Sequence, residues 1–142
     1  MDENSVTKYI TGTFESVEYV VASGTFFFIG SERHFPFATL VNADEHDAFS
    51  NLDRPGVFRL NIGVSKATFV SLFGPSKEES TATPRDFTLL DQLMPHPVYG
   101  QMYWVSILNP TDDTFQSRVQ PLLAEAYQMN AQKLARRTKG GD

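Results

Sequence analysis

The sequence contains no cysteine, and it has one tryptophan and three histidines among its 142 residues. Without thiols the chain cannot form disulfides, thiolate metal sites, iron–sulfur clusters or a cysteine nucleophile. This composition suits a reducing compartment, so we expect a cytoplasmic protein. None of the familiar cofactor-binding patterns is present, and we expect no cofactor and no bound metal.

Long apolar runs and excess positive charge are also missing. The longest apolar run, around residues 26–29, is far shorter than the ~20 residues that a membrane-spanning helix needs. The acidic N-terminus, residues 1–4, has no apolar segment typical of a secretory signal. The formal net charge is −5, whereas nucleic-acid-binding domains usually present a basic face. We therefore expect no membrane association, and DNA is disfavoured as a partner.

The chain has enough apolar content, 41%, to form a packed core, and its length fits a single domain over residues 1–142. Hydrophobic periodicity predicts an N-terminal helix through Val6, Ile10 and Phe14, then an antiparallel meander of three strands. Further along, the pattern predicts a strand at 57–62, a helix capped by Ser65, a short helix at 87–94, a strand at 103–108, a short helix capped by Thr111, and a new helix beginning at Pro121. The fold class is therefore α+β, with a mainly antiparallel sheet and helices packed on one face. Residues 75–86 are predicted to form a surface loop and 138–142 a polar tail.

The most distinctive segment runs from residue 51 to residue 66. Arg59 and Asn61 share one face of a predicted strand, and Ser65 precedes the free amides of a helix N-terminus beside Lys66. This arrangement is typical of an anion-binding surface. The alternative is a turn, an edge strand and an ordinary capped helix, in which Arg54 bonds to loop carbonyls.

A second segment, residues 94–104, gathers His96, Tyr99, Tyr103 and Trp104. These side chains are typical of a ligand pocket that contains a histidine able to exchange protons. The alternative is a rigid turn, bounded by prolines, whose aromatic side chains fill the core. Together the two segments supply our candidate ligand-binding residues, and none of these is predicted to be catalytic: Arg59, Asn61, Ser65, His96, Tyr99 and Trp104.

Two further charge clusters have weaker functional interpretations. Residues 44–47, Asp-Glu-His-Asp, offer metal-ligand or acid–base groups, but they lack the pattern of a calcium loop and are more typical of a solvated acidic loop. A basic run, residues 133–139, could contact phosphates, although such runs at a helix end commonly face solvent and match the helix dipole.

Several stretches of the chain resemble a small bacterial family of unknown function: residues 35–41, 52–63, 93–99 and 121–127. Residues 103–105, with Leu122, Leu123, Ala126 and Tyr127, are more distantly similar to the MmcQ/YjbR proteins. That second resemblance implies a double-wing, frataxin-like shape and suggests DNA binding.

Three functional hypotheses follow. We expect an uncharacterised, non-catalytic binding or interaction module for a small anion or a protein partner. The first alternative is nucleic-acid binding of the MmcQ/YjbR type through a local basic face. The second is an acid–base enzyme that uses His96 or the acidic cluster, and it requires His96 to lie within hydrogen-bonding reach of a carboxylate.

Overall fold

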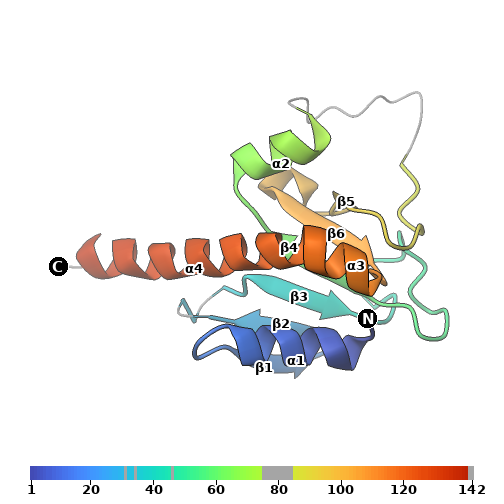
Figure 1. Ribbon diagram of the computed structural model, residues 1–142, viewed down its shortest axis with the longest axis horizontal. Coiled ribbons are helices and arrows are strands. Elements are labelled where there is room, and N and C mark those ends of the chain that lie inside the picture. The colour runs from blue at the N-terminus through green and yellow to red at the C-terminus, as the bar shows by residue number, and fades with distance from the viewer. Residues whose placement is uncertain (31, 34, 46, 75–84, 141–142) are drawn as a thin grey trace.

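The centre of the molecule is a six-stranded antiparallel sheet with the strand order β1-β2-β3-β4-β6-β5 (Figure 1). The computed structural model describes residues 1–30, 32–33, 35–45, 47–74 and 85–140. The α+β class predicted from the sequence is confirmed. The strands are β1 (Glu18–Ala22), β2 (Thr25–Ile29), β3 (Ala38–Val41), β4 (Arg59–Gly63), β5 (Met94–Pro95) and β6 (Trp104–Leu108). The helical elements are α1 (Glu3–Thr13), α2 (Lys66–Phe73), η1 (Gly100–Met102), α3 (Asp112–Thr114), η2 (Phe115–Val119) and α4 (Gln120–Gly140).

The predicted meander forms the first half of the sheet. Strands β1 and β2 pair with Ala22 opposite Thr25, so only Ser23 and Gly24 connect them. Both connecting residues have positive φ, 51° and 76°, which is the backbone of the tight turn that matches the twist of a hairpin. Glycine adopts this conformation at the second turn position without the strain that a Cβ would add.

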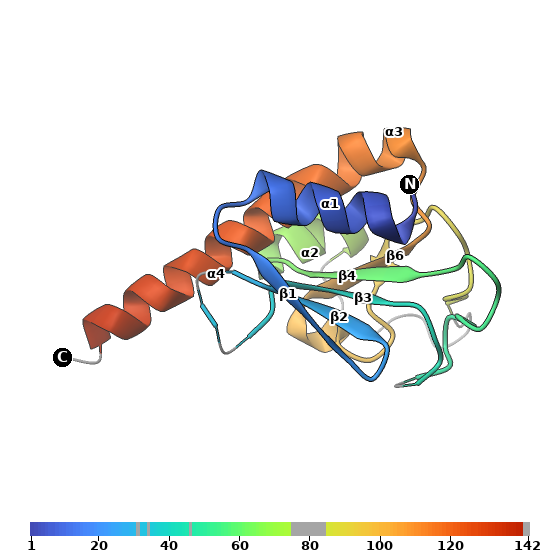
Figure 2. The same cartoon turned by 90° about the horizontal axis from the view of Figure 1, so that it is seen from below.

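One face of the sheet is apolar and covered by helices. On β4 it presents Leu60 and Ile62, and the neighbouring strands add further core residues: Phe28, Ala38, Leu40, Val105 and Ile107. Apolar side chains of α1, α2, η2 and α4 belong to the same core as this face. Figure 2 shows α1, α3 and α4 on one side of the sheet. Each buried valine, leucine, isoleucine or phenylalanine side chain contributes roughly 1.5–3 kcal/mol by leaving water. The core therefore lies between the helices and this face.

The predicted helix cap at Ser65 is confirmed. The Ser65 hydroxyl accepts a hydrogen bond from the amide of Thr68 at 3.1 Å, and α2 then ends at Gly74, whose φ is 94°. Thr111 caps α3 in the same way. These caps explain why local sequence predicted both helix starts correctly.

The helix predicted at 87–94 is wrong. Asp91 has a φ of 59°, its amide donates to the carbonyl of Leu108 at 2.6 Å, and its carboxylate accepts from the amide of Thr111 at 2.9 Å. These long-range bonds hold the segment alongside β6, and it leads into the short strand β5. Tertiary pairing therefore replaces the helix that the apolar spacing suggested.

The prediction that Pro121 starts a separate helix is also wrong. Helix α4 begins at Gln120 and continues from α3 through the π-helical turn η2. Proline has no N–H and its ring crowds the carbonyl of the preceding turn, and a widened turn accommodates both defects. Helix α4 extends to Gly140, through positions predicted to be a tail, and projects beyond the sheet (Figure 1).

Within the described ranges, no helix is long and apolar enough to cross a membrane. Most of the predicted surface loop, residues 75–84, and the last two residues of the predicted tail, 141–142, lie outside the described residues.

Candidate functional site

The opposite face of the sheet carries both polar and apolar side chains, and the polar ones gather on its central strands. Side chains alternate along a strand, so Arg59 and Asn61 of β4 point to this face, whereas the core residues of β4 point to the covered face. A cleft of about 580 Å³ opens over it. We call it the open-face cleft. Its lining residues come from β2, β3, β4, β6 and the loops around them: Thr25, Phe27, Phe35, Pro36, Thr39, Val41, Asp47, Arg59, Asn61, His96, Tyr99, Met102 and Trp104.

A buried ion pair lies in the cleft. Arg59 donates from Nη1 to Oδ1 of Asp47 at 3.0 Å and from Nη2 to Oδ2 at 2.8 Å. The side chains of Arg59 and Asp47 are only 2% and 8% exposed. The hydrogen bonds from Arg59 hold the pKa of Asp47 below its ordinary value despite burial. The pair is therefore fully charged at neutral pH and has no net charge.

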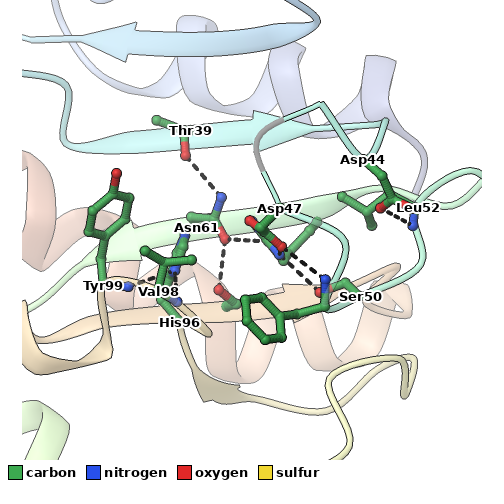
Figure 3. Close-up of polar contacts among 12 residues, drawn as sticks. Thr39, Asp44, Asp47, Ser50, Leu52, Asn61, His96, Val98 and Tyr99 are labelled. Carbon is green, nitrogen blue, oxygen red and sulfur yellow. Dashed lines mark hydrogen bonds and ion pairs between the residues drawn. The ribbon is translucent and has the colours of Figure 1, made fainter.

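Polar side chains from three positions in the sheet and one in a loop extend this pair into a network. Nε of Arg59 donates to Oδ1 of Asn61 at 3.0 Å, and the Ser106 hydroxyl donates to the same oxygen at 2.7 Å. The amide nitrogen of Asn61 donates to the hydroxyl of Thr39 at 3.0 Å, and Nη1 of Arg59 also donates to Oγ of Ser50 at 2.9 Å. Figure 3 shows the bond between the labelled Thr39 and Asn61, with Asp47 nearby. The network fixes the orientation of each side chain in the cleft floor.

Asp47 reaches Arg59 because its loop is tied down on either side. The carboxylate of Asp44 accepts from the amide of Leu52 at 2.8 Å, and Leu52 is buried. Arg54 donates to the carbonyls of Asn51, Ser50 and Thr88, as the structural alternative for this segment predicted. The acidic segment thus supplies an ion-pair partner for the cleft. His46 lies outside the described residues.

The neutral imidazole of His96 is held as a single tautomer. Its Nδ1 accepts from the backbone amides of Val98 and Tyr99, both at 3.0 Å, so the proton resides on Nε2. Burial, followed by the positive charge of Arg59, lowers the pKa of His96 to about 4, and Asp47 opposes this only in part. The imidazole is therefore neutral at physiological pH. Nε2 has no hydrogen-bond partner among the described residues.

Aromatic and apolar side chains form the walls and rim of the cleft. Phe27 and Trp104 are half-buried in the walls. Phe35, Tyr99 and Met102 are 59%, 53% and 66% exposed. Exposed apolar side chains gathered around a cavity are typical of a surface that is covered by a ligand or a partner.

Five of the six candidate residues converge on this cleft: Arg59, Asn61, His96, Tyr99 and Trp104. Their role in binding stays a prediction. Ser65 lies in a neighbouring cleft of about 340 Å³, which shares Trp104 with the first. There the amide of Ser65 donates to Glu125 at 3.0 Å, and the other carboxylate oxygen of Glu125 accepts from the Thr68 hydroxyl. A carboxylate from α4 therefore already occupies the anion position predicted at the start of α2.

Sequence reasoning missed Asp47 as the partner of Arg59, and it missed Thr25, Phe27 and Thr39. The alternation of each strand was visible in the sequence, so the residues of one face could have been grouped. The strand order that brings β2, β3, β4 and β6 together was not visible. Long-range pairing depends on the whole fold, and local periodicity does not report it.

Two other predicted features contribute no site within the described residues. The side chains of the basic run, residues 133–139, lie outside them. No group of three or more histidine, aspartate or glutamate side chains in the described ranges is arranged to hold a metal ion.

The model of a family of unknown function, DUF6194, matches residues 1–139, almost the whole chain. The chain belongs to this family. Neither a curated protein nor a solved structure matches it. The resemblance to an uncharacterised family is thus confirmed, whereas the likeness to the MmcQ/YjbR proteins and their double-wing shape stays a prediction.

Proposed function

We propose that this member of the family is a non-catalytic binding module that takes a small molecule into the open-face cleft. The observation that carries the proposal is the buried network of Asp47, Arg59 and Asn61 under an open cavity with aromatic walls. The volume of about 580 Å³ is within the range of small-molecule sites, which combine apolar walls with a few fixed polar groups.

The cost of the ion pair supports this proposal. Burying two charges loses hydration free energy, and apolar residues of similar volume often replace such pairs with no loss of stability. A pair buried in a cleft is therefore poorly explained by stability alone. Orienting Asn61 and the cleft floor for a ligand explains why charged residues occupy these positions.

The geometry of His96 argues against the acid–base alternative. No carboxylate hydrogen-bonds to His96 among the described residues, and its Nδ1 is occupied by the amides of Val98 and Tyr99. A pKa of about 4 makes it a poor proton acceptor at neutral pH. Asp47 is equally unsuited as a base, because Arg59 binds both of its oxygens.

The test is a screen of chemically diverse fragments, using the fluorescence of Trp104, the single tryptophan of the chain, as the signal. The blocking variant is Thr39→Phe, which places a ring in the cleft at a strand position, and aromatic residues are common in strands. The matched control is Gln116→Phe, at an exposed position of η2 on the helical side.

We expect hits that bind the wild type and Gln116→Phe equally and that lose affinity for Thr39→Phe. A screen without hits, or hits that bind Thr39→Phe unchanged, would show that the cleft is not a small-molecule site.

A further inference from the structure

The chemistry of the cleft floor specifies the class of ligand, provided that the cleft binds small molecules as proposed above. His96 is the first determinant. Its amide donates to the carbonyl of Trp104 at 2.9 Å, and its carbonyl accepts from the amide of Gly100 at 3.0 Å. With the backbone fixed and Nδ1 occupied, the only polar group that the side chain can offer is the N–H at Nε2. His96 lines both this cleft and a second one of about 310 Å³, and a ligand atom that hydrogen-bonds to its side chain must be an acceptor.

Charge balance is the second determinant. Among the residues that the structure describes, the charged side chains lining the cleft are Asp47 and Arg59, and each neutralises the other. The four bonds from Arg59 use four of its five N–H groups, so little of the guanidinium remains for an external anion. An anionic or cationic ligand would lose hydration in the cleft without gaining an opposite charge. The floor therefore favours an uncharged ligand.

The shape of the walls is the third determinant. The rings of Phe27, Phe35, Tyr99 and Trp104 come from separate segments and all line the cleft. Aromatic side chains stack on flat rings or meet them edge to face, which gains more than their buried area alone. A planar, unsaturated ring suits these walls better than a flexible aliphatic chain, since it also loses less conformational entropy on binding.

Thr25 is a further polar residue of the cleft that a ligand could contact. Its side-chain oxygen has no hydrogen-bond partner among the described residues, although the residue is only 3% exposed and lines the cavity. Leaving a buried hydroxyl unpaired is unfavourable, because it loses its hydrogen bonds to water. Thr25 lies on β2, whereas His96 follows β5, with three strands between them. A ligand that extends along the cleft could satisfy both.

We infer that the open-face cleft recognises an uncharged aromatic carbonyl compound, whose carbonyl oxygen accepts the hydrogen bond from Nε2 of His96 and whose ring lies among the aromatic walls. In this arrangement His96 is a fixed donor. The Asp47–Arg59 pair keeps the floor neutral and orients Asn61.

The experiment compares three probes that share one ring and differ in charge: benzamide, benzoate and benzylammonium. Binding is measured by Trp104 fluorescence and checked by amide chemical shifts of the cleft strands. A fragment of this size binds weakly, with a dissociation constant on the order of millimolar. We expect benzamide to bind about 10-fold more tightly than either charged probe, because only it avoids an unpaired buried charge.

Matched variants of His96 separate the hydrogen bond to the carbonyl from nonspecific binding of the probe. His96→Asn keeps an acceptor for the Val98 and Tyr99 amides but removes the donor at Nε2, and we expect benzamide affinity to fall about 5-fold. His96→Gln places an N–H near the position of Nε2 and should recover part of the lost benzamide affinity. Circular dichroism establishes that each variant is folded.

If at least one of the three probes binds, two results would overturn the inference while leaving the proposed function intact. One is tighter binding of benzoate or benzylammonium in a manner that Thr39→Phe abolishes. The other is benzamide binding that His96→Asn leaves unchanged. If none of the three probes binds while other fragments from the diverse screen do, the assigned ligand class is wrong. If no fragment of any class binds, the proposed function fails as well.

Discussion

The two faces of the central sheet are made by the same strands, yet they are built on different principles. On β4, Leu60 and Ile62 belong to a core covered by helices, while Arg59 and Asn61 belong to a polar network under an open cleft. All four side chains are buried to 2% exposure or less. Burial alone therefore does not distinguish a structural face from a candidate site.

What distinguishes the faces is how each side chain depends on its neighbours. An apolar core residue gains from contact area, which many partners supply. Each member of the polar network depends on one or two specific atoms, because a buried charge without its partner is heavily penalised. The open face is thus the more specific arrangement and the more easily broken by a single substitution.

The largest expected effect comes from breaking the ion pair. Arg59→Met should lower the free energy of unfolding by ~3–5 kcal/mol, because Asp47 is left buried without a counter-charge. The double variant Arg59→Met with Asp47→Leu should regain most of that loss. On the covered face, Leu60→Ala should cost ~2–5 kcal/mol, and no single second substitution is expected to restore it.

Urea unfolding monitored by circular dichroism measures all three variants. A double variant no more stable than Arg59→Met would contradict the view that the open face is held by pairing rather than by volume.

The second-largest expected effect is a pH dependence of the protein's stability that arises from the burial of His96 on the open face. Its folded pKa of about 4 lies below the ordinary value of 6.5, so between these values the unfolded chain binds a proton that the folded chain does not. Stability should therefore rise as pH increases from about 4 to 6.5, and the difference corresponds to about 3 kcal/mol. Arg59 and Asp47 face His96 and stay charged through this window, since the pKa of Asp47 is lowered.

The control for this prediction is His96→Asn, which cannot titrate but keeps the acceptor for the two backbone amides. Unfolding free energies measured across the pH range should show a shallower slope for the variant. Equal slopes for both proteins would mean that His96 is not held neutral by the fold.

The smallest expected effect compares two unpaired hydroxyls. Thr25 lies in the cleft and Thr7 in α1, on the covered side, and both have a buried oxygen without a partner among the described residues. Replacing either with valine should stabilise the ligand-free protein by ~1 kcal/mol, because an unsatisfied polar atom is removed.

Ligand binding then separates the two threonines. Thr25→Val should weaken the binding of a ligand that spans the cleft, whereas Thr7→Val should leave it unchanged. Thermal unfolding and titration of the same fragment measure both effects. Loss of affinity in both variants, or in neither, would remove Thr25 from the site.

The sequence by itself determined the local parts of this protein. Ser65 and Thr111 cap helices with their own side chains, the Ser23–Gly24 turn closes a hairpin, and alternation on β4 separates Leu60 from Arg59. These features depend on residues within a few positions of one another, so the pattern carries the information.

The tertiary structure alone decided the rest. Asp91 pairs with β6 instead of continuing a helix, Glu125 of α4 occupies the start of α2, and Asp47 joins Arg59 from a loop 12 residues earlier. His96 loses its ordinary proton affinity because the fold buries it near the positive charge of Arg59. Strand order and burial are properties of the whole chain, and they turn residues that are individually unremarkable in the sequence into one cleft.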